Sequence, residues 1–68
     1  MTDRAECIFT VKEFEGGQPF LACEILRGNL PSLGRKLLTF DVRNGMSLDE
    51  AKSLAETLNE QITHVAIT

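Results

Sequence analysis

The stretch Met46-Ser47-Leu48-Asp49-Glu50-Ala51 decides the fold, because it reads as the start of a helix placed between strand-like segments. The Ser47 hydroxyl is positioned to accept from the backbone N–H of Glu50, and the Glu50 carboxylate to accept from that of Ser47, which is the reciprocal capping box. This signature predicts one amphipathic helix from Leu48 to about Gln61. Its apolar stripe consists of Leu48, Ala51, Leu54, Ala55, Leu58 and Ile62.

Four segments outside the helix are rich in β-branched, aromatic and alternating apolar residues, which is typical of strands. They span residues 5–14, 20–27, 35–43 and 62–68, separated by glycine- and proline-containing turns. One helical stripe needs one sheet face to cover, so we expect an α+β two-layer sandwich in the order β-β-β-α-β, with one helix packed on a small, mostly antiparallel sheet. Sixty-eight residues make a single domain, 1–68. We place the fourth strand beside the first and, as a right-handed crossover, parallel to the third.

The register of the first hairpin follows from its apolar pattern, because a slip of one residue exchanges the two faces of a strand. A three-residue loop at 16–18 places Val11 opposite Cys23 and Phe9 opposite Ile25, which makes one continuous apolar face. In this register Cys7 and Cys23 are about 13 Å apart at ~3.4 Å per residue, which is too far for a disulfide. We therefore predict two buried, reduced thiols.

The second face of the sheet is also apolar in this register. It carries Ile8, Phe14, Phe20, Leu26 and Leu37, with Phe14 pairing with Phe20 across the hairpin. A monomer of this size rarely exposes such a patch. These residues therefore predict an interface, and the chain reads as a binding or interaction module that acts as a homodimer. The alternative is that the 28–34 loop folds over this face.

Charge gives a second hypothesis. The net charge of −3 argues against a general nucleic-acid or anionic-membrane binder, but the segment 25–45 is basic. A nucleic-acid-binding module would use the basic residues of this segment, namely Arg27, Arg35, Lys36 and Arg43.

Motifs that carry chemistry are lacking. Gly28 and Gly34 do not have the spacing of a phosphate-binding loop, and His64, Cys7 and Cys23 lack the spacing of metal ligands, so we expect no metal and no cofactor. A small enzyme with its site between subunits is a second alternative. Any small-molecule ligand is left open. The polar N-terminal residues and the lack of a long apolar run predict a cytoplasmic protein without a membrane segment.

Overall fold

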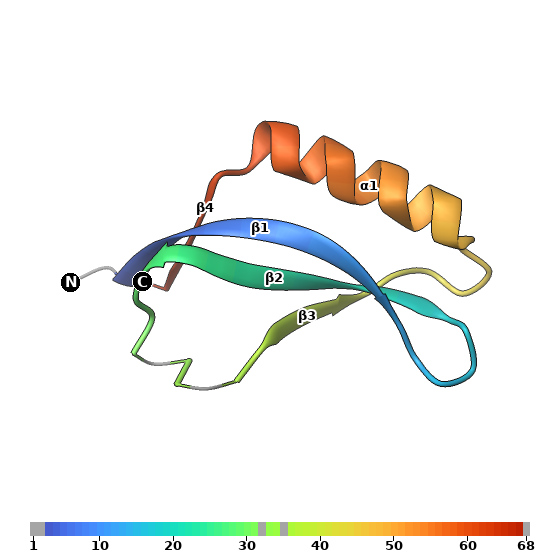
Figure 1. Cartoon of the computed structure of the whole chain (residues 1–68), viewed down its shortest axis with the longest axis horizontal. Coiled ribbons are helices and arrows are strands. Elements are labelled where there is room, and N and C mark those ends of the chain that lie inside the picture. The colour runs from blue at the N-terminus through green and yellow to red at the C-terminus, as the bar shows by residue number, and fades with distance from the viewer. Residues whose placement is uncertain (1–2, 32, 35, 68) are drawn as a thin grey trace.

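The computed structural model describes residues 3–31, 33–34 and 36–67. Its elements are β1 (Asp3–Glu13), β2 (Pro19–Gly28), β3 (Leu38–Asp41), α1 (Leu48–Gln61) and β4 (His64–Ile67). The strands form one antiparallel sheet in the order β3-β2-β1-β4, and α1 lies on one of its faces (Figure 1). The predicted α+β architecture and element order are confirmed. Within the described residues, no helix has the length and apolar character needed to span a membrane.

The helix begins where the capping signature predicts and ends at the predicted Gln61. The Ser47 hydroxyl accepts from the Glu50 N–H at 3.1 Å, and the Glu50 carboxylate accepts from the Ser47 N–H at 3.2 Å. At the other end Ile62 takes an extended conformation. Ala51 and Ala55 are the helix residues buried against the sheet, and their small side chains allow the helix to pack closely.

The predicted hairpin register is wrong by two residues. Glu13 pairs with Pro19, so the loop has five residues, and Phe9 lies opposite Cys23. Two hydrogen bonds fix this loop: the Phe14 N–H donates to the Gln18 carbonyl at 2.9 Å, and the Gly17 N–H donates to the Phe14 carbonyl at 2.8 Å. From Pro19 to Ile25, a shift of two residues keeps each side chain on its predicted face, because side chains alternate with a period of two.

The new register brings the two thiols together. Cys7 lies opposite Ile25, two residues along β2 from Cys23, so the predicted separation of about 13 Å is wrong and ~7 Å is expected at ~3.4 Å per residue. A bulge at Leu26 follows directly, since Glu6 pairs with Arg27. Both cysteines are buried and unbridged, as predicted.

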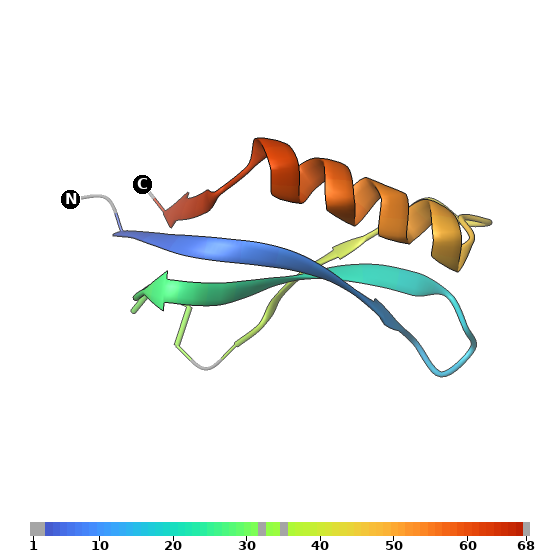
Figure 2. The same cartoon turned by 45° about the horizontal axis from the view of Figure 1, so that its top comes forward.

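The fourth strand pairs with β1, as predicted, but its direction is the reverse of the prediction. Because β3 is antiparallel to β2 and β4 is antiparallel to β1, β3 and β4 run antiparallel to each other. Only Ile62 and Thr63 separate α1 from β4, which is too short a link for the chain to turn back. The chain therefore continues into β4 in the direction of the helix (Figure 2). The third strand is also shorter than the predicted 35–43.

The core lies between α1 and the two long strands. Its buried cluster consists of Cys7, Phe9, Leu21, Cys23 and Ala55. The helix packs on β1 and β2 but, within the described chain, makes no close backbone approach to β3. The molecule is accordingly elongated, with extents of 39 × 25 × 17 Å, and the inner face of β3 is only partly covered.

Candidate binding surfaces

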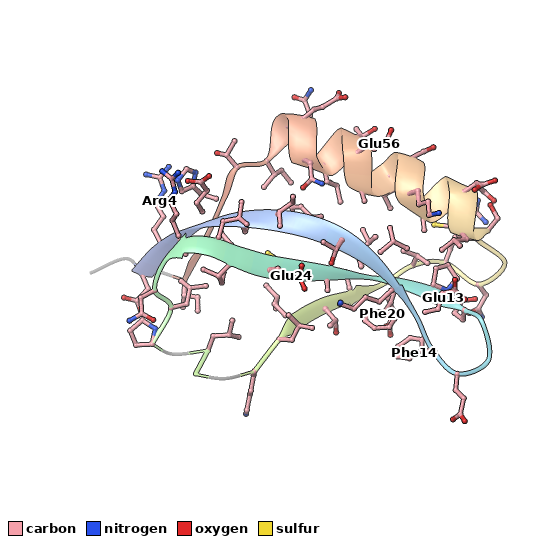
Figure 3. The ribbon with its side chains drawn as sticks, in the orientation of Figure 1. Arg4, Glu13, Phe14, Phe20, Glu24 and Glu56 are labelled. Atoms are coloured by element: carbon pink, nitrogen blue, oxygen red, sulfur yellow. The ribbon has the colours of Figure 1, made fainter. Side chains whose placement is uncertain are left out.

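The outer face of the sheet, turned away from α1, carries Ile8, Phe14 and Phe20 of the residues predicted to form an interface, while Leu26 is at the bulge and Leu37 directly precedes β3. Phe14, Leu26 and Leu37 are 50%, 55% and 50% exposed, so the described part of the 28–34 loop does not cover them. Ile8 and Phe20 are half-buried on the same face. The Phe14 and Phe20 rings stack with centroids 4.3 Å apart, which confirms the predicted contact although the two residues are not direct partners in the ladder (Figure 3).

An ion pair divides this outer face. Lys12 Nζ lies 3.6 Å from Glu24 Oε1, and the pair crosses the strands between the Phe14–Phe20 stack and Ile8. Ala22, in the row of side chains between Lys12 and Glu24, is fully buried. The predicted apolar patch is thus two smaller groups on either side of a charged bridge.

Of the predicted basic residues that the structure describes, Arg27 and Arg43 lie at opposite ends of the sheet. Arg27 is near the end of β2, opposite Glu6. Arg43 lies beyond β3 at the other end of the sheet, where its carbonyl accepts from Gln18 Nε2 at 3.4 Å. The eight residue-to-residue steps from Pro19 to Arg27 span about 27 Å at ~3.4 Å per step. Lys36 is in the exposed segment before β3, and Arg35 falls outside the described residues. Nucleic-acid binding stays a prediction that this arrangement does not test.

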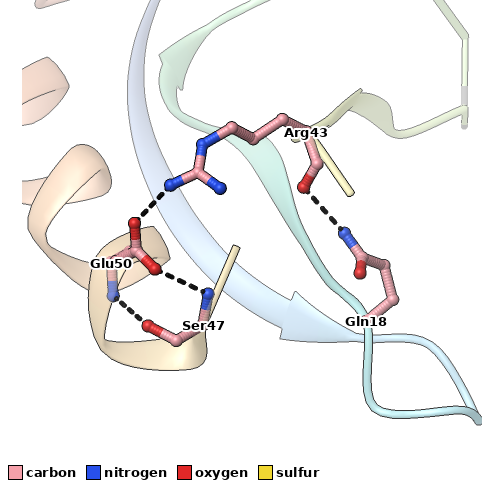
Figure 4. Close-up of polar contacts among 4 residues, drawn as sticks. All are labelled: Gln18, Arg43, Ser47 and Glu50. Atoms are coloured by element: carbon pink, nitrogen blue, oxygen red, sulfur yellow. Dashed lines mark hydrogen bonds and ion pairs between the residues drawn. The ribbon is translucent and has the colours of Figure 1, made fainter. Parts of the chain in front are cut away.

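Arg43 has a local partner. Its guanidinium forms an ion pair with the Glu50 carboxylate, which also accepts from Ser47 (Figure 4). The hydrogen bond from the Ser47 backbone lowers the pKa of Glu50, with further contributions from the Ser47 hydroxyl and the Arg43 charge. Arg43 thereby ties the segment after β3 to the first turn of α1.

The buried thiols bear on the enzyme hypothesis. Burial raises the pKa of Cys23 to about 11, and its contact with the neighbouring Cys7 thiol adds to this effect. The nucleophile in thiol chemistry is the thiolate, so Cys23 is unreactive near pH 7. The cysteine pair therefore supports a structural role in the core.

A groove with a volume of about 350 Å³ lies between α1 and β3. Phe9 and Leu21 form its floor, and the Phe9 and Phe40 rings lie 6.0 Å apart. The lining residues are mostly apolar and come from the sheet, the segment after β3 and the helix: Phe9, Leu21, Phe40, Asp41, Val42, Arg43, Met46, Leu54, Leu58 and Ile62. Such a surface accepts apolar side chains and excludes water from them.

Sequence reasoning missed this groove. The alternation of Leu38, Phe40 and Val42 identifies them as an inward face. It does not indicate that the helix lies over β1 and β2 and leaves Phe40 43% exposed.

No family model, curated protein or solved structure matches this chain.

Proposed function

We propose that this protein is a small interaction module that acts as a homodimer. The observation that carries the proposal is the solvent-accessible surface area of the chain. A compact monomer of 7.5 kDa exposes about 4250 Å². This chain exposes 4979 Å², an excess of about 700 Å². One partner in a standard protein interface contributes about 800 Å². The excess is therefore close to what one subunit buries in a dimer.

The shape of the chain supports the same proposal. Its radius of gyration is 12.8 Å, whereas a compact domain of 68 residues has about 11 Å. Few large side chains are fully buried: Leu21 and Cys23 are the largest among the described residues. A core of this size supplies only about 3–5 kcal/mol, and self-association is a common way to add to it. A second copy would cover apolar surface that one chain leaves in water.

We further propose that the protein is located in the cytoplasm. Two free, buried thiols in contact are typical of a reducing compartment.

Light scattering of the purified protein tests the proposal. We expect a molar mass of twice the 7.5 kDa chain. We also expect a denaturation midpoint that rises with protein concentration, because association stabilises the folded state by mass action. A mass of one chain at millimolar concentration, together with a midpoint that does not depend on concentration, would overturn it.

A further inference from the structure

The outer edge of β3 is open, and the hydrogen-bond pattern of the sheet identifies which groups it presents. The main-chain N–H of Phe9 points away from β2, since it donates to Asn59. Cys23, which lies opposite Phe9 in the ladder, therefore points its main-chain N–H and carbonyl toward β3, where it pairs with Leu38. The main-chain N–H and carbonyl of the next residue, Thr39, therefore point away from β2. In the described chain no strand lies beyond β3, which forms the lower edge of the sheet in Figure 1.

We propose that the second copy in the dimer binds at this edge, with the two β3 strands pairing antiparallel about a two-fold axis. This inference rests on the proposed homodimer and names its contact surface. Thr39 and Asp41 both direct their main-chain groups outward, because residues alternate along a strand. Pairing Thr39 with Asp41 of the second copy gives two symmetry-related pairs, each exchanging both N–H···O bonds. The neighbouring register, Thr39 with Thr39 of the second copy, gives only one such pair within the four residues of β3.

The side chains on the groove side agree with this register. It places Phe40 opposite Phe40 of the second copy, and cross-strand aromatic pairs stabilise sheets. Phe40 is 43% exposed in one chain, so it has surface to bury. Each groove opens beside β3, and the two would join into one apolar trough between two α1 helices. Leu54 and Leu58 of each helix would line its sides.

The β3 edge is better suited to a second copy than the outer face is. A contact over the outer face would desolvate the Lys12–Glu24 ion pair, and burial of an ion pair carries a large desolvation cost. The groove lining has only Asp41 and Arg43 as charged residues, and Arg43 is already paired with Glu50. Exposed main-chain groups next to an apolar groove are the elements used in strand addition.

A proline substitution tests the edge directly. Thr39→Pro removes an N–H that faces away from β2, so the sheet within one chain keeps its bonds, as proline in edge strands generally allows. We expect Thr39→Pro to weaken self-association at least tenfold by light scattering or sedimentation. The matched variant Thr39→Val keeps the N–H and should remain a dimer. Circular dichroism and a cooperative unfolding transition establish that both variants are folded.

A second pair of variants keeps the inference testable if Thr39→Pro does not fold. Phe40→Glu and Phe40→Lys each place like charges opposite each other across the two-fold axis, so each alone should be monomeric. An equimolar mixture should form a heterodimer, because opposite charges then face each other. A mixture that stays monomeric would overturn the proposed register.

The outer-face variant Phe14→Glu separates this inference from the proposal on which it rests. We expect it to leave the dimer intact. A wild-type dimer that Phe14→Glu splits and Thr39→Pro leaves whole would overturn the β3 contact while keeping the homodimer. A monomeric wild-type protein would overturn both.

Discussion

The side-chain amide of Asn59 forms both hydrogen bonds that the main chain of Phe9 would otherwise exchange with a neighbouring strand. Asn59 Oδ1 accepts from the Phe9 N–H at 2.7 Å, and Asn59 Nδ2 donates to the Phe9 carbonyl at 2.9 Å. The strand β4 pairs with Asp3–Glu6, and Thr63 accepts from the Cys7 N–H. Asn59 thus provides hydrogen-bond partners for the edge of β1 just beyond the residues that pair with β4. These bonds also fix α1 to the sheet.

Removal of this amide should destabilise the fold. Asn59→Ala leaves the Phe9 N–H and carbonyl without partners at a part-buried position, which costs about 1–3 kcal/mol. Asn59→Asp keeps the acceptor but loses the donor, and it places a carboxylate against the Phe9 carbonyl, so it should not rescue stability. Urea denaturation measures both variants. Glu60→Ala, an exposed neighbour on the same helix, is the control and should change stability by no more than about 0.5 kcal/mol. An equal effect of Asn59→Ala and Glu60→Ala would contradict the proposed role of the amide.

The helix cap gives a second prediction. Ser47→Ala removes the acceptor for the Glu50 N–H and should cost about 1 kcal/mol. Ser53→Ala is the matched control, because Ser53 is an exposed serine in the interior of the same helix and should be neutral or slightly stabilising. A chemical-denaturation midpoint that Ser47→Ala does not move would show that the cap contributes nothing.

The same cap predicts a pH dependence. The folded-state pKa of Glu50 lies below its ordinary value of 4.5, chiefly because the Ser47 backbone donates to the carboxylate. The folded state therefore favours the ionised form, so the stabilisation is present above pH 4.5 and is lost as pH falls through the lowered pKa. Denaturation midpoints of wild type and Glu50→Gln from pH 7 to pH 3 should converge toward the acid end. Parallel curves would contradict this assignment.

The helix was predictable from sequence because its determinants are local. Ser47 and Glu50 are three residues apart, so the chain itself brings the cap together once the first turn forms. The partner of Asn59 is fifty residues away. Asparagine has a low helix propensity, so its presence in the last turns of a helix weakly indicates another role. The sequence does not indicate that its partner is Phe9.

The register was not predictable from hydrophobic pattern, for a related reason. Pairing Phe9 with Ile25 or with Cys23 presents the same faces, so burial of apolar residues cannot choose between them. The choice lies in the loop, where the Gly17 N–H reaches the Phe14 carbonyl. Ile8 and Phe20 were therefore assigned to the correct face, whereas the distance between Cys7 and Cys23 was predicted wrongly.

The thiol pair gives a fourth prediction. Because burial raises the pKa of Cys23 to about 11, above its ordinary value of 9.0, the folded state favours the neutral thiol. This contribution to stability is present below pH 9 and is lost as pH rises toward 11. Wild type should thus lose more stability than Cys23→Ala between pH 8 and pH 10.5, measured by urea denaturation.

Labelling with a thiol reagent at pH 7.5 should be slow in water and fast in denaturant. Rapid labelling of Cys23 in the folded protein would contradict the reading of a buried, neutral thiol.

The last prediction concerns the end of β2, where the bulge at Leu26 brings the chain close to β1. Gly28 has a φ of 93°, and a Cβ there would lie 3.1 Å from Ala5 Cα and 3.2 Å from the Arg4 carbonyl oxygen. Both neighbours are main-chain atoms, so neither can move aside cheaply, and the positive φ is itself unfavourable for any residue with a Cβ. Gly28→Ala should therefore cost about 1–3 kcal/mol.

Gly16→Ala is the matched control, since a Cβ at that position meets no atom within 4 Å, and it should change stability by less than about 1 kcal/mol. Urea denaturation of the two variants gives the comparison. Because Gly28 is far from β3, its substitution should lower stability without changing the dissociation constant of any dimer formed at the β3 edge. Equal stability of the two alanine variants would show that β2 does not approach β1 at Gly28 as closely as the bulge requires.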